Sequence, residues 1–180
     1  ELTAAATMMA GQICVAATRF LVHDAVLPTF AERITAAFRA VKTGPGAKAD
    51  SQMGSLIDKA NEARLHQLIE QAGDEGELLL KGDNPFGRDN AGAFVSPSLF
   101  RIEDTASPLV QDELFGPLVS VERFADEAEA VAKANATPYG LAASVHTRDL
   151  ERAMRLSRAI RAGTVWLNCH SRLFAEGETG

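Results

Sequence analysis

Cys14 is one of two cysteines in a chain of 180 residues, and it follows Gly11 by three positions. A glycine at this spacing lets the backbone turn tightly and lets a ligand approach it closely. Beside a helix N-terminus, a thiol would be favoured as the thiolate, which is the form that acts as a nucleophile. Free cysteine is also among the most buried residue types and behaves as a small apolar side chain. These residues alone therefore favour a core cysteine and leave a reactive thiol as the alternative.

Glu113 and Phe115 form a second candidate group, in the segment QDELFGP (111–117). An ionised glutamate only accepts hydrogen bonds and can take two hydroxyl donors at once, which suits a ribose. A phenyl ring two residues later would suit a flat heterocycle. The alternative is a solvated acidic pair, Asp112 and Glu113, on a loop that Phe115 anchors in the core. Taken by themselves, the residues favour that alternative.

The composition is that of an ordinary globular domain, with 46% hydrophobic residues, 23% charged residues and a formal net charge of −6. Because no basic stripe is present, we expect no nucleic-acid partner. No apolar run has the length of a membrane span. Two distant cysteines are typical of a reducing compartment, so we expect a cytoplasmic protein. The histidines lack the spacing of metal ligands, so we expect no metal and only structural or solvated roles for His23, His66, His146 and His170.

Short apolar strands alternate with amphipathic helices along the chain, a pattern that predicts an α/β fold with a largely parallel sheet. Asp24 is expected to cap a helix, and Pro97 favours a sheet edge or a bulge for its extended segment. No pattern specifies the order of the strands. The expected strands are 18–23, 77–81, 92–100, 118–124, 141–147 and 164–168, and the expected helices are 3–10 and those that begin after Asp24, Asp58, Asp126 and Asp149.

Six segments in order resemble the catalytic domain of the NAD(P)-dependent aldehyde dehydrogenases. The resemblance runs from about Thr3 to Asn168, nearly the whole chain. It implies that residues 1–180 form a three-layer α/β sandwich with a largely parallel sheet, of the catalytic-domain type of this family. The segments are GQICVAATR (11–19), GPGAKADSQMGSLID (44–58), GAFVSPSLF (92–100), QDELFGP (111–117), YGLAASVHT (139–147) and GTVWLN (163–168).

The resemblance implies a chemical role for each of the three candidate residues. Cys14 matches the nucleophile, whose thiolate attacks the aldehyde to give a thiohemiacetal and, after hydride transfer to the nicotinamide, a thioester that water hydrolyses. Its backbone N–H would supply half of an oxyanion hole. Glu113 matches the residue that holds the nicotinamide ribose, and Phe115 the residue that packs near the nicotinamide ring. The implied cofactor is NAD or NADP, and the implied substrate is a small aldehyde.

The C-terminal segment is expected to line the substrate entrance. Asn168 ends the strand that leads into the substrate-tunnel loop, and Leu173 and Phe174 are candidate tunnel residues. Ordinary packing is an equal alternative for Leu173 and Phe174. Cys169 is expected to be a passive small residue.

The sequence also departs from the family pattern. Glu1 does not match the general-base glutamate of the Glu-Leu-Gly-Gly type motif, and the asparagine that completes the oxyanion hole belongs upstream. No GxGxxG pattern replaces the dinucleotide-binding domain. We therefore expect a catalytic domain that lacks the cofactor-binding domain and the C-terminal oligomerisation strand, does not turn over alone, and belongs to a homo-oligomeric enzyme. The alternatives are a CoA-acylating relative and a non-catalytic structural or interaction protein of the same fold, although Cys14, Glu113 and Phe115 together favour an enzyme.

Overall fold

The fold is built on a four-stranded sheet, seen in a computed structural model that describes residues 1–87 and 89–172. The strands lie in the order β1 (Arg19–His23), β4 (Leu118–Phe124), β3 (Ser98–Arg101) and β2 (Glu77–Leu80). The β1–β4 and β3–β4 pairs are parallel, and β2 is an antiparallel edge strand. A second, parallel pair joins β5 (Ala142–Val145) to β6 (Thr164–Leu167). The predicted α/β fold with a largely parallel sheet is confirmed.

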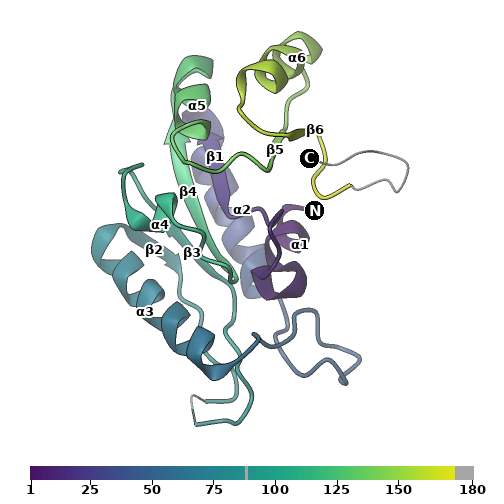
Figure 1. Cartoon of the computed structure of the whole chain (residues 1–180), viewed down its shortest axis with the longest axis vertical. Coiled ribbons are helices and arrows are strands. Elements are labelled where there is room, and N and C mark those ends of the chain that lie inside the picture. Colours follow the sequence, from purple (N-terminus) through teal and green to yellow (C-terminus); the bar gives the residue numbers. More distant parts are fainter. Residues whose placement is uncertain (88, 173–180) are drawn as a thin grey trace.

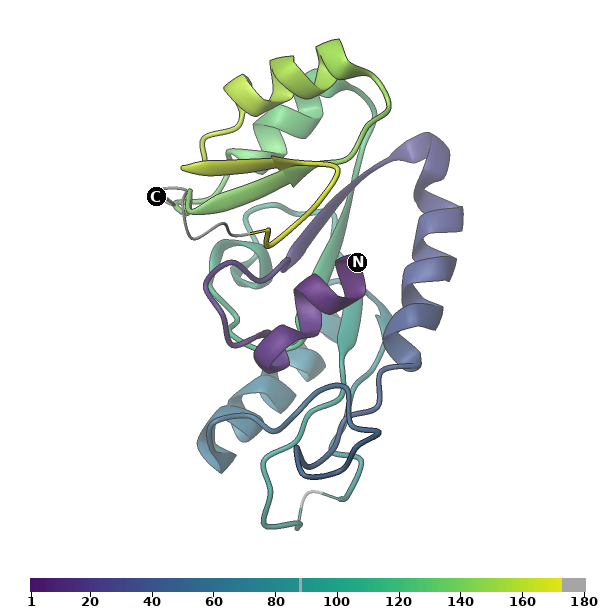
Figure 2. The same ribbon diagram turned by 90° about the vertical axis from the view of Figure 1, so that its right-hand side faces the viewer.

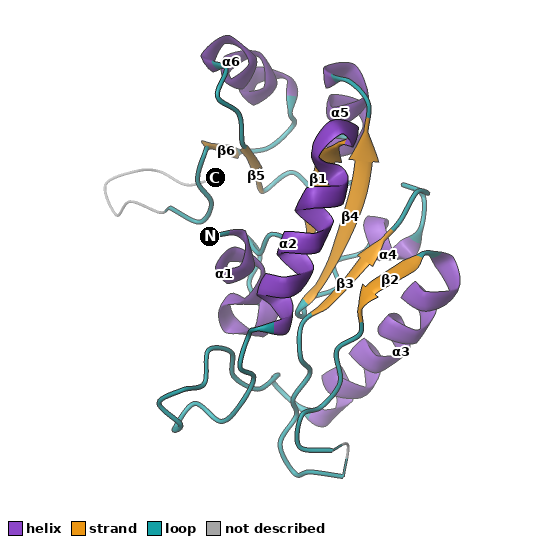
Figure 3. Ribbon diagram, turned by 180° about the vertical axis from the view of Figure 1, so that it is seen from behind, coloured by secondary structure: helices purple, strands orange, loops and turns teal. Residues whose placement is uncertain are grey.

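Helices cover both faces of the main sheet and give it three layers. Figures 1 and 3, taken from opposite sides, show α3 (Lys59–Glu75) on one face and α2 (Leu27–Arg39) on the other. Each face has its own hydrophobic core. Alternation along β3 supplies both, because Phe100 packs with the α3 core and Leu99 with the α2 core. A strand buried on both faces in this way reads as a continuous apolar run.

Aspartates begin three of the helices, as the sequence predicts. The side chains of Asp58, Asp126 and Asp149 each accept a hydrogen bond from a backbone N–H in the first turn of α3, α5 (Glu127–Ala134) and α6 (Leu150–Ala159) respectively. Such a bond satisfies one of the N–H groups that a helix start leaves without a partner. The other α-helices are α1 (Leu2–Thr7) and α4 (Pro108–Gln111), and two short 3₁₀ helices are η1 (Met8–Gly11) and η2 (Asp24–Val26).

Two local expectations are wrong. Asp24 does not cap α2, whose N-cap is Val26. Its carboxylate instead forms a bidentate ion pair with Arg123 of β4, with N–O distances of 2.7 and 2.6 Å, so a distant charged partner outweighs the local capping preference. Pro97 lies neither at an edge nor in a bulge: β3 begins at the next residue and runs inside the sheet, between β4 and β2. In the described residues, no helix is long and apolar enough to cross a membrane.

Candidate active site

Cys14 lies on a loop between α1 and β1, in a turn closed by a 2.9 Å hydrogen bond from the Ala16 N–H to the Ile13 carbonyl. Its side chain is exposed, which argues against the core cysteine that residue statistics favour. The loop leads into β1, so Cys14 does not itself begin a helix. Chemically, the arrangement presents an accessible nucleophile on a short, hydrogen-bonded turn.

Gly11 brings the Cys14 loop into direct contact with the segment that contains Glu113 and Phe115. Its φ of +71° is left-handed, and a Cβ at this position would lie 2.2 Å from the Gly116 carbonyl oxygen and 2.8 Å from the Pro117 nitrogen. Figure 2 shows the two segments running side by side beneath β5 and β6. Only glycine permits this approach, because it alone combines a left-handed backbone with the absence of a Cβ. The contact unites the two candidate groups, although they are about a hundred residues apart in the chain.

A hydrogen-bonded bridge across the start of α3 supports the same contact. Oε1 of Gln12 accepts hydrogen bonds from the Ile57 N–H at 2.9 Å and from Nδ2 of Asn61 at 3.5 Å. Arg64, one turn further along α3, donates to Oδ1 of Asn61 at 2.8 Å and also to the Leu114 carbonyl. The first two turns of α3 thereby connect the residue before the Cys14 turn to the loop that follows Glu113.

Glu113 and Phe115 both face solvent on their loop. The backbone N–H of Glu113 donates to the Tyr139 hydroxyl at 3.0 Å, and its carboxylate side chain is exposed. Phe115 is 40% exposed and has a left-handed φ of 48°, a conformation that is uncommon for a bulky residue and concentrates at functional sites. The alternative in which Phe115 anchors the loop is wrong, because Leu114 is the buried residue there, at 4% exposure.

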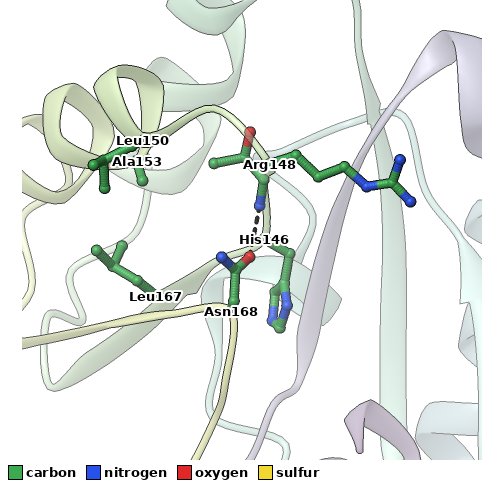
Figure 4. A pocket seen from close by; sticks show the side chains of 7 residues that line it. His146, Arg148, Leu150, Ala153, Leu167 and Asn168 are labelled. Atoms are coloured by element: carbon green, nitrogen blue, oxygen red, sulfur yellow. Dashed lines mark hydrogen bonds between the residues drawn. The ribbon is translucent and has the colours of Figure 1, made fainter.

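Asn168 follows β6 and lines a pocket of about 600 Å³ with residues of β6, of α6 and of the loop that follows β5. Its Oδ1 accepts a hydrogen bond from the Thr147 N–H at 2.9 Å, which turns its amide nitrogen toward the pocket (Figure 4). Desolvation lowers the pKa of the neighbouring His146, the carboxylate of Glu1 opposes this shift, and the charge of His170 adds to it. Cys14 does not line this pocket. The other two tunnel candidates, Leu173 and Phe174, lie outside the described residues.

The structure adds residues that the sequence analysis did not single out as parts of a site. They are Gln12, Asn61, Arg64, Tyr139 and His170, all of which hold the two loops or the segment after β6. Gln12 and Tyr139 lie within segments that resemble the family, but each of the five makes a contact with a residue distant in sequence, and that contact is visible only in the fold. Among the described residues, no group of three or more His, Cys, Asp or Glu side chains has a geometry that would hold a metal ion.

The fold and this site define an α/β protein with an exposed thiol next to a loop that displays a carboxylate and an aromatic ring. The model of the aldehyde dehydrogenase family matches residues 1–180. The chain belongs to the aldehyde dehydrogenase family.

A mammalian and a plant relative agree with this membership. The chain is 38% identical over 160 residues to the cytosolic aldehyde dehydrogenase 1 of Rattus norvegicus, a match that covers 89% of this chain and 32% of the rat protein. It is 33% identical over 171 residues to betaine aldehyde dehydrogenase 1 of Oryza sativa subsp. japonica, covering 95% of this chain and 34% of the rice protein. The chain thus spans about a third of the length of these relatives.

Solved structures share the fold closely. A betaine aldehyde dehydrogenase double mutant from Staphylococcus aureus, solved in complex with NAD⁺, superposes with a TM-score of 0.92 at 33% identity, over 99% of this chain and 36% of that one. A γ-glutamyl-γ-aminobutyraldehyde dehydrogenase from Burkholderia cenocepacia gives a TM-score of 0.89 at 36% identity, over 96% of this chain and 34% of that one. The three-layer fold is therefore that of an aldehyde dehydrogenase.

Proposed function

We propose that this chain provides the nucleophile of an NAD(P)-dependent aldehyde dehydrogenase that oxidises a small aldehyde to a carboxylic acid. The observation that carries the proposal is the packing of Gly11 against Gly116, which sets the loop of the exposed Cys14 thiol against the loop of Glu113 and Phe115. Family membership and the NAD⁺ complex of a structural neighbour support it. The rat relative is named as a cytosolic aldehyde dehydrogenase, which supports a cytoplasmic location for this protein. That the protein belongs to a homo-oligomeric enzyme stays a prediction.

In the proposed mechanism, the Cys14 thiolate attacks the aldehyde carbonyl carbon and forms a thiohemiacetal. The oxygen of the former carbonyl takes up the negative charge, and the backbone N–H of Cys14 stabilises it as one oxyanion donor. Loss of hydride from the same carbon leaves a thioester on Cys14. Attack by water then releases the carboxylic acid and returns the thiol, so that one difficult oxidation is divided into two easier steps.

The residues present fit the nicotinamide end of NAD(P). Glu113 offers an exposed carboxylate that suits the two hydroxyl groups of a ribose. Phe115 offers an exposed ring that suits the face of the nicotinamide. When bound, NAD(P)⁺ supplies the hydride acceptor. These two residues would hold and orient it, while the pocket beside Asn168 is the proposed approach for the aldehyde.

Selective alkylation tests the nucleophile. The chain is exposed to a limiting amount of iodoacetamide, and peptide mass mapping compares the labelling of Cys14 with that of Cys169, which is half-buried and serves as the internal control. We expect Cys14 to react first in the native chain and both thiols to react after unfolding in urea. Native labelling of Cys169 with Cys14 untouched would contradict the proposal. In the complete enzyme, transfer of the acyl group to coenzyme A instead of water would identify the CoA-acylating alternative.

A further inference from the structure

His170 joins the segment after β6 to the loop of the nucleophile. Its Nε2 lies 2.8 Å from the carbonyl oxygen of Val15, the residue after Cys14, and its Nδ1 lies 3.1 Å from Oγ of Ser144 on β5. The imidazole ring also packs on Trp166, with 4.9 Å between the ring centroids. These contacts engage both ring nitrogens and place a tilted indole ring beside the imidazole.

The hydrogen-bond partners of His170 determine which of its ring nitrogens carries the proton. A carbonyl oxygen only accepts hydrogen bonds, so Nε2 carries the proton that is donated to Val15. In the neutral imidazole, Nδ1 is then the acceptor, and the Ser144 hydroxyl donates to it. Since both nitrogens of His170 are used within the protein, the side chain has no free position at which to exchange a proton with a substrate. Its contacts suit a residue that acts through the loop.

The Val15 carbonyl is an effective point at which to hold this loop. The turn from Ile13 to Ala16 is closed by its own hydrogen bond and so moves as a unit. On one side, Gly11 packs against Gly116 and Gln12 accepts from the Ile57 N–H. On the other side, the Ala17 N–H donates to the Ala5 carbonyl at 3.2 Å, and the hydrogen bond from His170 holds the Val15 carbonyl within the turn itself. Without the His170 contact, the hydrogen bonds that hold the turn would be those of the residues that flank it, Gln12 and Ala17.

We propose that His170 is a positioning residue that, through the Val15 carbonyl, orients the Cys14 N–H toward the oxyanion formed during acyl chemistry, with Ser144 setting the rotation of the ring. This inference rests on the proposed role of Cys14 as the nucleophile. It goes beyond that role because it assigns a separate side chain, 156 positions away in the chain, to the geometry of the oxyanion donor.

Two reactions of the same thiol separate positioning from nucleophilicity. In acylation by p-nitrophenyl acetate, the Cys14 thiolate attacks the ester carbonyl, p-nitrophenolate leaves, and the acetyl group remains as a thioester. A tetrahedral oxyanion forms on the way, so the rate depends on the backbone N–H. In alkylation by iodoacetamide, sulfur displaces iodide and no oxyanion forms. Both rates are measured on the whole chain with Cys169→Ser, which leaves Cys14 as its only thiol.

Three substitutions of His170 then isolate the contact. His170→Phe keeps a ring to pack on Trp166 but loses both hydrogen bonds, and His170→Asn can reach only the Ser144 side. His170→Gln places an amide N–H near the former Nε2 and restores donation to Val15. Because a misplacement of about 1 Å can cost ~10²-fold in rate, we expect acylation to fall about tenfold in the Phe and Asn variants. Gln should recover most of it, and alkylation should stay within about twofold throughout.

The other possible results would overturn the proposed positioning role of His170. Equal acylation of the parent and His170→Phe would overturn it, because packing alone would then account for the side chain. Parallel losses of acylation and alkylation that Gln does not rescue would also overturn it and indicate a general structural role. If His170→Phe fails to fold, Ser144→Ala replaces it, with the same expected loss confined to acylation. Absence of acylation on Cys14 in the parent would refute the proposed nucleophile itself, and this inference with it.

Discussion

Replacing Gly11 with alanine tests the contact on which the proposed site depends. The added Cβ would lie 2.2 Å from the Gly116 carbonyl oxygen and 2.4 Å from its carbonyl carbon, which are backbone atoms that cannot turn away as a flexible side chain would. The left-handed φ of +71° adds a cost that glycine does not have. Left-handed backbone costs a non-glycine residue about 1–2 kcal/mol, and forcing extra volume into a packed place costs about 1–3 kcal/mol.

The two costs together predict that Gly11→Ala lowers the free energy of unfolding by about 2–5 kcal/mol, a large share of the ~5–15 kcal/mol of a typical domain. Urea unfolding followed by the fluorescence of Trp166, the single tryptophan, measures the change, with circular dichroism as a second probe. Gly54→Ala is the matched control, because a Cβ there meets nothing within 4 Å and its φ is not left-handed. The control should change stability by less than about 1 kcal/mol.

The same variant should also separate the two loops of the site. A clash at Gly11 is relieved most directly by moving the Cys14 loop away from Gly116, and a shift near 1 Å predicts a loss of roughly 10²-fold in acylation of Cys14. Alkylation should change far less, since it requires only an accessible thiol. If Gly11→Ala unfolds at the same urea concentration as Gly54→Ala and acylates at the parent rate, the close approach does not exist as described and the argument for a joined site fails.

Two further predictions concern carboxylates with different roles. In the complete enzyme, Glu113→Gln should slow hydride transfer, which is measured by the absorbance of the reduced cofactor. Alkylation of Cys14 should stay at the parent rate. Hydride transfer at the parent rate would rule out the ribose role of Glu113. Glu62 is buried, which raises its pKa, but hydrogen bonds from Lys59 and Asn84 lower it by more, so its net pKa lies below the ordinary value. Its contribution should therefore be complete above its ordinary pKa of 4.5 and should be lost as the pH falls from there through the lower pKa of the folded state. Glu62→Gln should cost about 1–3 kcal/mol at pH 7 in urea unfolding. This loss of unfolding free energy should shrink as the pH is lowered toward 3. Glu32→Gln, at an exposed position, is the control. A loss that does not change with pH, or that equals the loss in the control, would contradict a lowered pKa for Glu62.

Local features of the fold were predictable because their causes are local. Asp58, Asp126 and Asp149 begin helices through hydrogen bonds that span three residues, a distance that a sequence motif records directly. Asp24 carries the same local signal, yet its carboxylate pairs with Arg123, 99 positions away. The capping preference is worth about 1 kcal/mol, so a bidentate ion pair of comparable or greater strength can redirect it. The strand order has the same origin in distant pairings and could not be predicted.

The candidate site likewise contains residues that the sequence indicates and contacts that only the fold reveals. Cys14, Glu113 and Phe115 stand in segments that resemble the family and could be selected as candidates from the sequence, whereas the side chains that hold their loops in place could not. Tyr139 meets the Glu113 N–H across 26 residues, and His170 meets the Val15 carbonyl across 155. A contact made to a backbone group leaves no mark on the residue type of its partner. Such supports therefore become visible only when the fold is known.

The geometry also explains which positions near Cys14 restrict residue type. Gly11 is restricted because any Cβ would enter the Gly116 backbone, and Gln12 because its amide both accepts from the Ile57 N–H and donates to the Met9 carbonyl. Val15 contributes only its carbonyl to the contact with His170, so its side chain is free to vary as far as that contact is concerned. The loop of the thiol is therefore held by contacts of Gly11, the Gln12 amide and the Val15 main-chain oxygen. The order Gly-Gln-x-Cys agrees with this, because the two positions at which residue type is restricted precede the thiol, and the contact that follows it acts on the backbone.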